Sequence, residues 1–186
     1  MRKVSVFNSV SLDGYFTDAR GDMSWAHKNA NDPEWQRFTN DNAAGGGTLL
    51  FGRKTYEMMK SFWPTPQAKQ QMPKVAEVMT TSEKIVFSKT LKDPGWQNVK
   101  VISDDLVSTI VKLKASDGSP MVIMGSGTLI TQLAKAGLVD EFQIIVVPVV
   151  LGSGRTMFEG NEQTWLKLVS TRKFNNGNTL LHYVRS

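Results

Sequence analysis

The stretch MVIMGSGTLITQLAKA, residues 121–136, joins a strand pattern to a helix pattern through two glycines. Residues 121–124 form a short apolar run, which is typical of a buried strand. Residues 128–136 place apolar side chains at helical spacing, and Gly137 marks the end of that helix. A buried strand, a tight turn and a helix in this order form the repeating unit of an α/β sheet with parallel strands.

The same alternation of patterns extends to both sides of this stretch. Further strands are predicted at Val4–Val10, Thr48–Phe51, Lys84–Ser88, Val99–Ile102 and Glu141–Val150. A helix begins at Asp32-Pro33 and ends at Gly45, and residues 17–31 predict a loop. Other helices are predicted at Lys54–Phe62, at Gln67–Met79 with a break at Pro73, and at Asp104–Ala115 with Ser103 as N-cap.

The C-terminal segment adds antiparallel strands. Two strand patterns, Trp165–Phe174 and Leu180–Arg185, are joined by residues 175–178, and the Asn176-Gly177 pair is typical of a hairpin turn. The sequence therefore predicts an α/β fold with a central, mixed, mostly parallel sheet, flanking helices and a C-terminal antiparallel hairpin.

Length and composition limit the possible classes of protein. The chain has 186 residues, 40% of them hydrophobic, which suits one domain with an ordinary core. No apolar run approaches the roughly 18 residues that span a membrane, and residues 1–3 lead into a strand, so we expect a cytoplasmic protein. Cysteine is absent and there are two histidines, so we expect no disulfide, no thiolate chemistry and no metal.

The net charge of +5 is compatible with an anionic partner. The 22 Lys and Arg residues are spread along the chain and form no basic run or basic helix face, so no nucleic-acid partner is expected. A basic surface of this kind also suits a phosphorylated small molecule.

Three strand ends carry residues that suit phosphate. Gly125-Ser126-Gly127-Thr128 lies where backbone amides and a helix N-terminus can meet an anion, although Ile130 replaces the third glycine of the dinucleotide fingerprint. Gly52-Arg53-Lys54-Thr55 puts two cations at a helix start, where they oppose the helix dipole unless an anion is bound. Ser88-Lys89-Thr90 follows a third strand.

Each of these segments alone is also compatible with an ordinary turn or a solvated helix start. Ligands of α/β sheets bind beyond the carboxyl ends of the strands. Together, the three segments predict a binding edge for an extended, phosphorylated molecule.

The order of the motifs resembles the dihydrofolate reductase superfamily, in particular the branch similar to the reductase domain of bacterial riboflavin biosynthesis. The resemblance covers residues 3–185 and is carried by residues 11–14 (SLDG), 50–57 (LFGRKTYE), 86–91 (VFSKTL), 124–127 (MGSG), 140–141 (DE) and 148–154 (PVVLGSG). It implies a three-layer dihydrofolate reductase-like fold, with residues 1–186 as a single reductase domain.

The resemblance also implies NADPH as cofactor and assigns residues to it. Ser88 and Lys89 would meet the adenosine 2′-phosphate, which favours NADPH over NADH. The other phosphates would be held by Gly52, Arg53, Lys54, Thr55, Gly125, Ser126, Gly127 and Thr128. Backbone groups of Ser9 and Val10 would meet the nicotinamide carboxamide, and the substrate end of the cleft would be flanked by Leu151, Gly152 and Gly154.

Proton donation and substrate binding leave alternatives open. Reduction of a C=N or C=O bond by hydride requires a proton, and Asp13, just past the first strand, is the candidate donor or else a turn-forming residue. Glu34 matches by position the acid that grips the pterin in folate reductases, or else simply favours its helix start. Trp25, with Trp35 and Phe38, would stack on a flat ring or else belong to the core.

The resemblance implies a reductase that acts on a pyrimidine- or pteridine-like ring, similar to 5-amino-6-(5-phosphoribosylamino)uracil reductase. The His-x-Glu and paired cysteines of the zinc deaminase often attached to that enzyme are absent, which leaves the pathway open. Genuine dihydrofolate reduction and a non-catalytic nucleotide or nucleic-acid binding module stay as alternatives. A homodimer is expected by resemblance, and from the apolar run Ile144–Leu151 and the strand containing Trp165.

Overall fold

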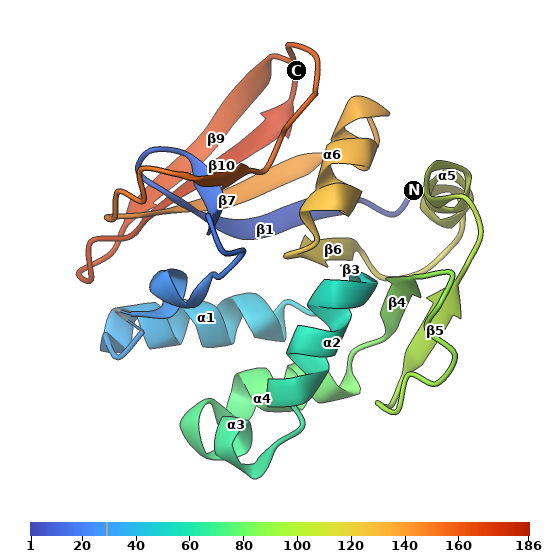
Figure 1. The fold of residues 1–186 in the computed structure, drawn as a ribbon, viewed down its shortest axis with the longest axis horizontal. Helices are drawn as coiled ribbons and strands as arrows, with labels where there is room; N and C mark the ends of the chain where they lie inside the picture. The colour runs from blue at the N-terminus through green and yellow to red at the C-terminus, as the bar shows by residue number, and fades with distance from the viewer. Residues whose placement is uncertain (29) are drawn as a thin grey trace.

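The computed structural model describes residues 1–28 and 30–186, and its centre is one eight-stranded sheet (Figure 1). Asn29, part of the predicted loop 17–31, lies outside the described residues. The strand order is β5-β4-β3-β6-β1-β7-β10-β9. These strands span Val4–Ser11 (β1), Thr48–Gly52 (β3), Lys84–Phe87 (β4), Val99–Ile102 (β5), Met121–Met124 (β6), Glu141–Val147 (β7), Leu166–Lys173 (β9) and Thr179–Arg185 (β10).

The directions of the strands confirm the mixed sheet. The six strands from β5 to β7 pair in parallel, whereas β10 pairs antiparallel with both β7 and β9. The predicted turn between β9 and β10 closes through a hydrogen bond from the Gly177 amide to the Phe174 carbonyl, 3.0 Å long. Gly177 has φ +89°, which glycine tolerates because it has no Cβ.

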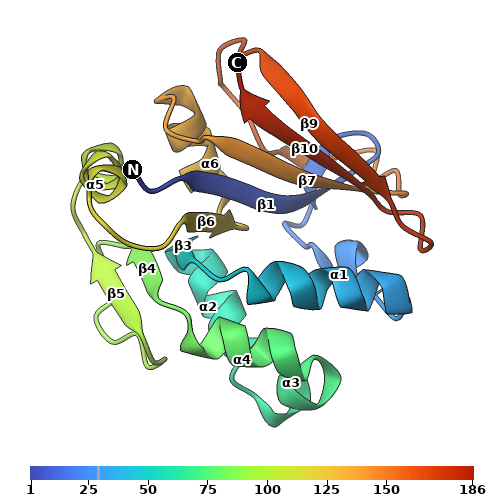
Figure 2. The ribbon, with the colours of Figure 1, turned by 180° about the vertical axis from the view of Figure 1, so that it is seen from behind.

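Helices cover both faces of the sheet and make the fold three layers thick (Figures 1 and 2). One face carries α5 (Leu106–Ala115) and α6 (Gly127–Lys135). The other face carries α1 (Pro33–Ala44), α2 (Arg53–Phe62), α3 (Pro66–Gln71) and α4 (Pro73–Thr81). Pro73 separates α3 from α4, as the sequence predicts. A 3₁₀ turn, η1, spans Ser24–His27.

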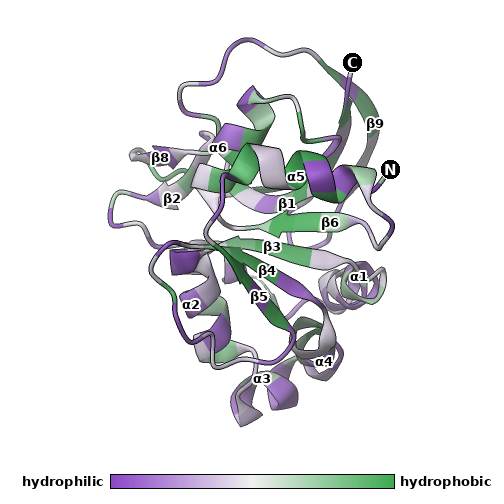
Figure 3. Ribbon diagram, turned by 90° about the vertical axis from the view of Figure 1, so that its right-hand side faces the viewer, coloured by the Kyte–Doolittle hydropathy of each residue, from purple (hydrophilic) through white to green (hydrophobic). Residues whose placement is uncertain are grey.

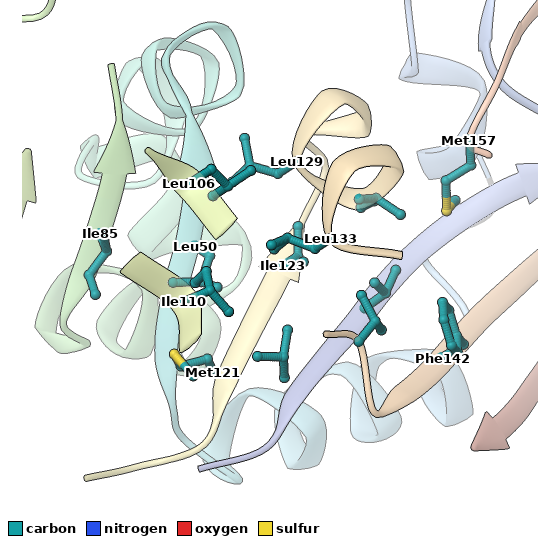
Figure 4. Close-up of a cluster of buried hydrophobic side chains, with 14 of the residues drawn as sticks. Leu50, Ile85, Leu106, Ile110, Met121, Ile123, Leu129, Leu133, Phe142 and Met157 are labelled. Atoms are coloured by element: carbon teal, nitrogen blue, oxygen red, sulfur yellow. The ribbon is translucent and has the colours of Figure 1, made fainter. Parts of the chain in front are cut away.

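The core follows the alternation of the strands. Side chains on one face of the sheet pack against α5 and α6, with Val6, Ile123 and Leu133 fully buried (Figure 4). Side chains on the opposite face, Phe51 and Val86 among them, pack against α2 and α4. In Figure 3 the central strands β3, β4 and β6 are mostly hydrophobic, whereas α2 and α3 carry many hydrophilic residues, as expected of a sheet covered by helices.

The structure differs from the predictions made from local sequence patterns in three places. A second, two-stranded sheet pairs β2 (Tyr15–Asp18) with β8 (Gly154–Thr156), whereas β2 and η1 lie in or beside the predicted loop 17–31. Such short strands are held by pairing with a partner far away in sequence, so alternation within the strand alone does not reveal them. The N-cap of α5 is Asp105, whose carboxylate accepts from the Ser108 amide over 2.8 Å, and not Ser103.

The run Ile144–Leu151 was expected to contribute to a dimer contact, but its first part lies inside the sheet. Strand β7 ends at Val147, before Pro148, and lies between β1 and β10 inside the sheet. The edge strands of the sheet are β5 and β9; beside β9 Trp165 is 76% exposed, and along β9 Leu168 is 50% exposed. No helix among the described residues is long and apolar enough to cross a membrane.

Candidate active site

Parallel strands bring the three predicted phosphate segments to one edge of the sheet. Strands β4, β3, β6 and β1 are neighbours in that order, and their carboxyl ends point the same way. Ser88 follows β4, Gly52 ends β3 and Gly125 follows β6. The edge therefore gathers three segments, the first and last of which are more than 70 residues apart in the chain.

The centre of this edge is the Gly125–Ser126 turn, which leads from β6 into α6. Both residues are left-handed, with φ +64° at Gly125 and φ +56° at Ser126. The Ser126 amide donates to Thr55 Oγ1 over 3.0 Å, and Ser126 Oγ accepts from the Gly52 amide over 2.9 Å. These reciprocal bonds fasten the first turn of α6 to the first turn of α2.

The starts of α2 and α6 both lack a side-chain cap from their own N-cap residue. Gly52, the N-cap of α2, has no side chain, and Ser126, the N-cap of α6, uses its Oγ for the Gly52 amide instead. The first amides of a helix have no intrahelical acceptor, and its dipole makes that end positive. Two such ends held together form a place where a phosphate-bearing ligand is stabilised.

Cations surround these helix starts. Arg53 and Lys54 are exposed in the first turn of α2, and Arg53 Nε lies 3.9 Å from Glu57 Oε1, a long and exposed ion pair that holds Arg53 weakly. Lys89 is exposed in the loop after β4. The Ser88 hydroxyl orders that loop by accepting from the amides of Thr90 and Leu91 over 3.2 and 3.0 Å.

Asn8 is a site residue that the sequence analysis does not identify. Its side chain is 6% exposed, and its amide pairs with the backbone of Gly125: Nδ2 donates to the Gly125 carbonyl over 3.3 Å, and the Gly125 amide donates to Oδ1 over 2.7 Å. The sequence offers one signal for it: Asn8 follows Val4 and Val6 on the same face of β1, and both valines are fully buried, so a polar residue there is unusual.

Asp13 lies in the turn after β1, and its carboxylate accepts hydrogen bonds from two amides of the loop after β7. The Gly152 amide donates to it over 2.7 Å, and the Leu151 amide over 3.1 Å. Hydrogen bonds from the Ser11 side chain and from the Gly152 and Leu151 amides lower the pKa of Asp13 below its ordinary value. These contacts favour a structural role, in which Asp13 joins the two loops, over donation of a proton.

Glu34 is likewise engaged within the protein. Its Oε1 accepts from Arg172 Nη2 over 3.2 Å, and its Oε2 accepts from the Asn175 amide over 3.1 Å. The carboxylate thus anchors the β9–β10 hairpin to α1. Arg172 also lies 4.8 Å above the Phe174 ring centroid, so the anchor combines an ion pair with a cation–π contact.

The aromatic residues around α1 pack together. Trp35 meets Phe174 edge-on, with ring centroids 4.9 Å apart, and Phe38 lies 4.8 Å from Phe174. Trp25 packs on the same apolar cluster and donates its indole N–H to the Asp22 carbonyl over 3.1 Å. These contacts favour the core alternative for this group.

The remaining candidates lie on β1 and β8. Ser9 and Val10 are half-buried in β1 and paired with β7. Gly154 begins β8 and approaches Thr17 so closely that a Cβ would come within 2.0 Å of the Thr17 carbonyl oxygen. Only glycine fits where these two backbones meet.

Relatives of known sequence cover the whole chain. YyaP and YwjB of Bacillus subtilis (strain 168), both described as uncharacterized, are each 30% identical to it. The alignments cover 95% of this chain and 91% of YyaP, and 100% of this chain and 99% of YwjB.

Solved structures share the architecture. A putative riboflavin biosynthesis protein from Shewanella sp. PV-4 matches with a TM-score of 0.74 and 25% identity over 99% of both chains. A deaminase/5-amino-6-(5-phosphoribosylamino)uracil reductase from Thermotoga maritima matches with a TM-score of 0.67 and 17% identity, over 100% of this chain and 57% of that chain. A pyrimidine reductase-like protein from Corynebacterium diphtheriae matches with a TM-score of 0.64 and 14% identity, over 100% of this chain and 92% of that chain.

A family model gives the most direct assignment. The model of the RibD C-terminal domain matches residues 2–180, nearly the whole chain. Together with the strand order and the solved relatives, this match identifies the fold as dihydrofolate reductase-like. The chain belongs to the RibD C-terminal domain family.

Proposed function

We propose that the chain is an NADPH-dependent reductase that passes hydride to a small heterocycle of the pyrimidine or pteridine kind. The observation that carries this proposal is the pair of helix starts, α2 and α6, fastened by Ser126 beside three exposed cations. An elongated coenzyme with several phosphates matches that arrangement. The solved relatives support the ring class of the substrate, because they are named as a putative riboflavin biosynthesis protein, a pyrimidine reductase-like protein and a 5-amino-6-(5-phosphoribosylamino)uracil reductase.

When bound, NADPH would supply the hydride. The amides at the starts of α2 and α6 would hold its pyrophosphate, with Arg53 and Lys54 balancing the charge. Ser88 and Lys89 would face the 2′-phosphate at the neighbouring strand end. The backbone of Ser9 and Val10 would orient the nicotinamide, and the loop held by Asp13, residues 151–154, would border the substrate.

Folate reduction receives less support than reduction of another ring. The acid that would grip a pterin, Glu34, already accepts from Arg172 and from the Asn175 amide. Each oxygen of this carboxylate already accepts from one donor of the hairpin, so a pterin would have to share the carboxylate with Arg172 and Asn175. The cytoplasmic location and the homodimer stay predictions, the homodimer supported by the exposed apolar residues on and beside β9.

Replacing Lys89 by alanine is expected to weaken NADPH binding about tenfold and to leave NADH binding unchanged, because only NADPH carries the 2′-phosphate that the ammonium would meet. Fluorescence or calorimetric titration with both coenzymes measures this difference. Lys112→Ala, an exposed site on α5, removes the same charge far from this edge and is the control. Equal losses for both coenzymes would refute the 2′-phosphate assignment, and a wild-type protein that binds neither would refute the proposed function.

We propose that Asp13 positions the substrate loop. Asp13→Asn replaces one accepting oxygen by an NH₂ group and removes the negative charge, which weakens the hold on the loop. The Michaelis constant for the ring substrate should therefore rise about tenfold, while kcat keeps its wild-type dependence on pH between 5 and 8. Asp105→Asn at the start of α5 is the control, since Asp105 also accepts from a backbone amide, that of Ser108, and does not contact the loop held by Asp13. A hundredfold loss of kcat with an unchanged Michaelis constant would instead make Asp13 the proton donor. Steady-state kinetics across this pH range distinguish the two results.

A further inference from the structure

The side chain of Asn8 replaces a backbone partner at the point where two strands separate. The parallel ladder between β1 and β6 runs from Val4 opposite Met121 to Phe7 opposite Met124. At the next residue, Gly125, the chain turns left-handed and leaves the ladder. The Asn8 amide then bonds both the carbonyl and the amide of Gly125, so the peptide groups that leave the sheet are still paired.

This pairing costs burial of a polar group. Asn8 is 6% exposed on a strand face that otherwise carries fully buried valines at positions 4 and 6. A leucine or valine at position 8 would satisfy the core, whereas a buried amide is stable only while its hydrogen bonds are made. The arrangement therefore serves the Gly125–Ser126 turn and adds nothing to the apolar packing.

The turn itself needs external support. Ser126 is a non-glycine residue at φ +56° and ψ 53°, a conformation that persists only where the surroundings hold it. Asn8 grips the residue before it, and Thr55 and Gly52 grip Ser126 itself. Gly52 ends β3 and Thr55 lies in the first turn of α2, whereas Asn8 ties the turn to β1 on the other side of β6.

We propose that Asn8 is a positioning residue of the coenzyme site, which fixes the Gly125–Ser126 turn so that the first amides of α6 face the coenzyme pyrophosphate. This inference rests on the proposed function. Asn8 need not touch the coenzyme. Without it, the turn loses its link to β1, and the amides at the start of α6 lose their fixed direction.

Asn8→Leu tests the proposal with two ligands that differ in the pyrophosphate. NADP⁺ affinity, measured by calorimetry, should fall tenfold or more, whereas adenosine 2′-monophosphate, measured by NMR titration, should bind within twofold of wild type. Ser5→Ala is the control, because the Ser5 hydroxyl donates to the Met121 carbonyl at the other end of the same strand pair. NADP⁺ binding within twofold of wild type, or equal losses for both ligands, would overturn the proposal.

Asn8→Asp gives a pH-dependent change in NADP⁺ affinity that a general loss of stability would not produce. A protonated carboxyl can both donate to the Gly125 carbonyl and accept from its amide, whereas an ionised one can only accept. The ratio of variant to wild-type NADP⁺ affinity should therefore rise toward one as the pH falls from 8 to 5.5. A ratio that stays constant over this range would contradict the proposed contact, even if Asn8→Leu does not fold.

Amide exchange separates this inference from the proposed function. In protein without coenzyme, the amide protons of Gly125 and Ser126, which donate to Asn8 and Thr55, should exchange faster in Asn8→Leu than in wild type, because the turn has lost its support. Unchanged exchange there would overturn the positioning role. A wild-type protein that binds neither NADP⁺ nor NADPH, with exchange faster in the variant, would reject the coenzyme and leave the support of the turn established.

Discussion

Lys84→Met is expected to lower the free energy of unfolding by about 3 kcal/mol, because buried carbonyls that lose a donor each cost ~1–3 kcal/mol. Lys84 is fully buried at the start of β4, and its Nζ donates to the carbonyls of Thr80, Ser82 and Gln97 over 2.9, 2.7 and 3.3 Å. The ammonium also lies 4.4 Å from the Trp96 ring centroid. Methionine has a similar volume, so the variant removes the donor without opening a large cavity.

Chemical denaturation at pH 7 measures this loss, and Lys100→Met on β5 is the control. Lys100 is exposed, so its replacement should change the free energy of unfolding by at most about 0.5 kcal/mol. If Lys84→Met were as stable as Lys100→Met, the three carbonyls would not depend on the ammonium.

The difference in the free energy of unfolding between wild type and Lys84→Met should also depend on pH. Burial lowers the pKa of Lys84 from 10.5 to about 8 in the folded protein. Between these two values the unfolded chain binds more protons than the folded one, so the contribution of Lys84 to the free energy of unfolding rises with pH. The gap between wild type and Lys84→Met should therefore widen from pH 8 to 10, and a gap that narrows would contradict the lowered pKa.

The sequence was sufficient for elements whose signals are local. The helix start at Asp32-Pro33, the break at Pro73 and the Asn176-Gly177 turn each depend on the conformational limits of a few adjacent residues, and all three are confirmed. The meeting of the three predicted phosphate segments was also foreseeable, because strand ends of a parallel sheet lie at one edge whatever the details of the packing. Their binding of phosphate stays a prediction.

What the sequence could not show depends on residues far apart in the chain. Asn8 looks like any polar residue in an alternating strand until Gly125, 117 positions later, is seen to pair with it. Asp13 has a role in holding the loop only because the Leu151 and Gly152 amides lie opposite it. A lysine at the start of a strand is expected to be exposed, but α4 and the loop before β5 enclose Lys84.

Gly125→Ala is expected to weaken NADP⁺ binding on the order of a hundredfold, because it displaces the turn at the centre of the proposed coenzyme site. A Cβ at this position would lie 2.6 Å from Thr55 Cγ2, too close for two carbon atoms. Thr55 can relieve this contact only by rotating, and rotation moves its Oγ1 away from the Ser126 amide that now donates to it. The clash therefore breaks the bond that fastens α6 to α2.

Gly46→Ala separates this effect from backbone strain alone. Gly46 has φ +69°, close to the +64° of Gly125, but nothing lies within 4 Å of its Cβ position. Both substitutions should therefore cost about 1 kcal/mol in the free energy of unfolding from the left-handed backbone. Only Gly125→Ala should reduce NADP⁺ affinity, as calorimetric titration would show. If both variants bound NADP⁺ as wild type does, the contact with Thr55 would not matter to the coenzyme, and the site would lie away from the Gly125–Ser126 turn.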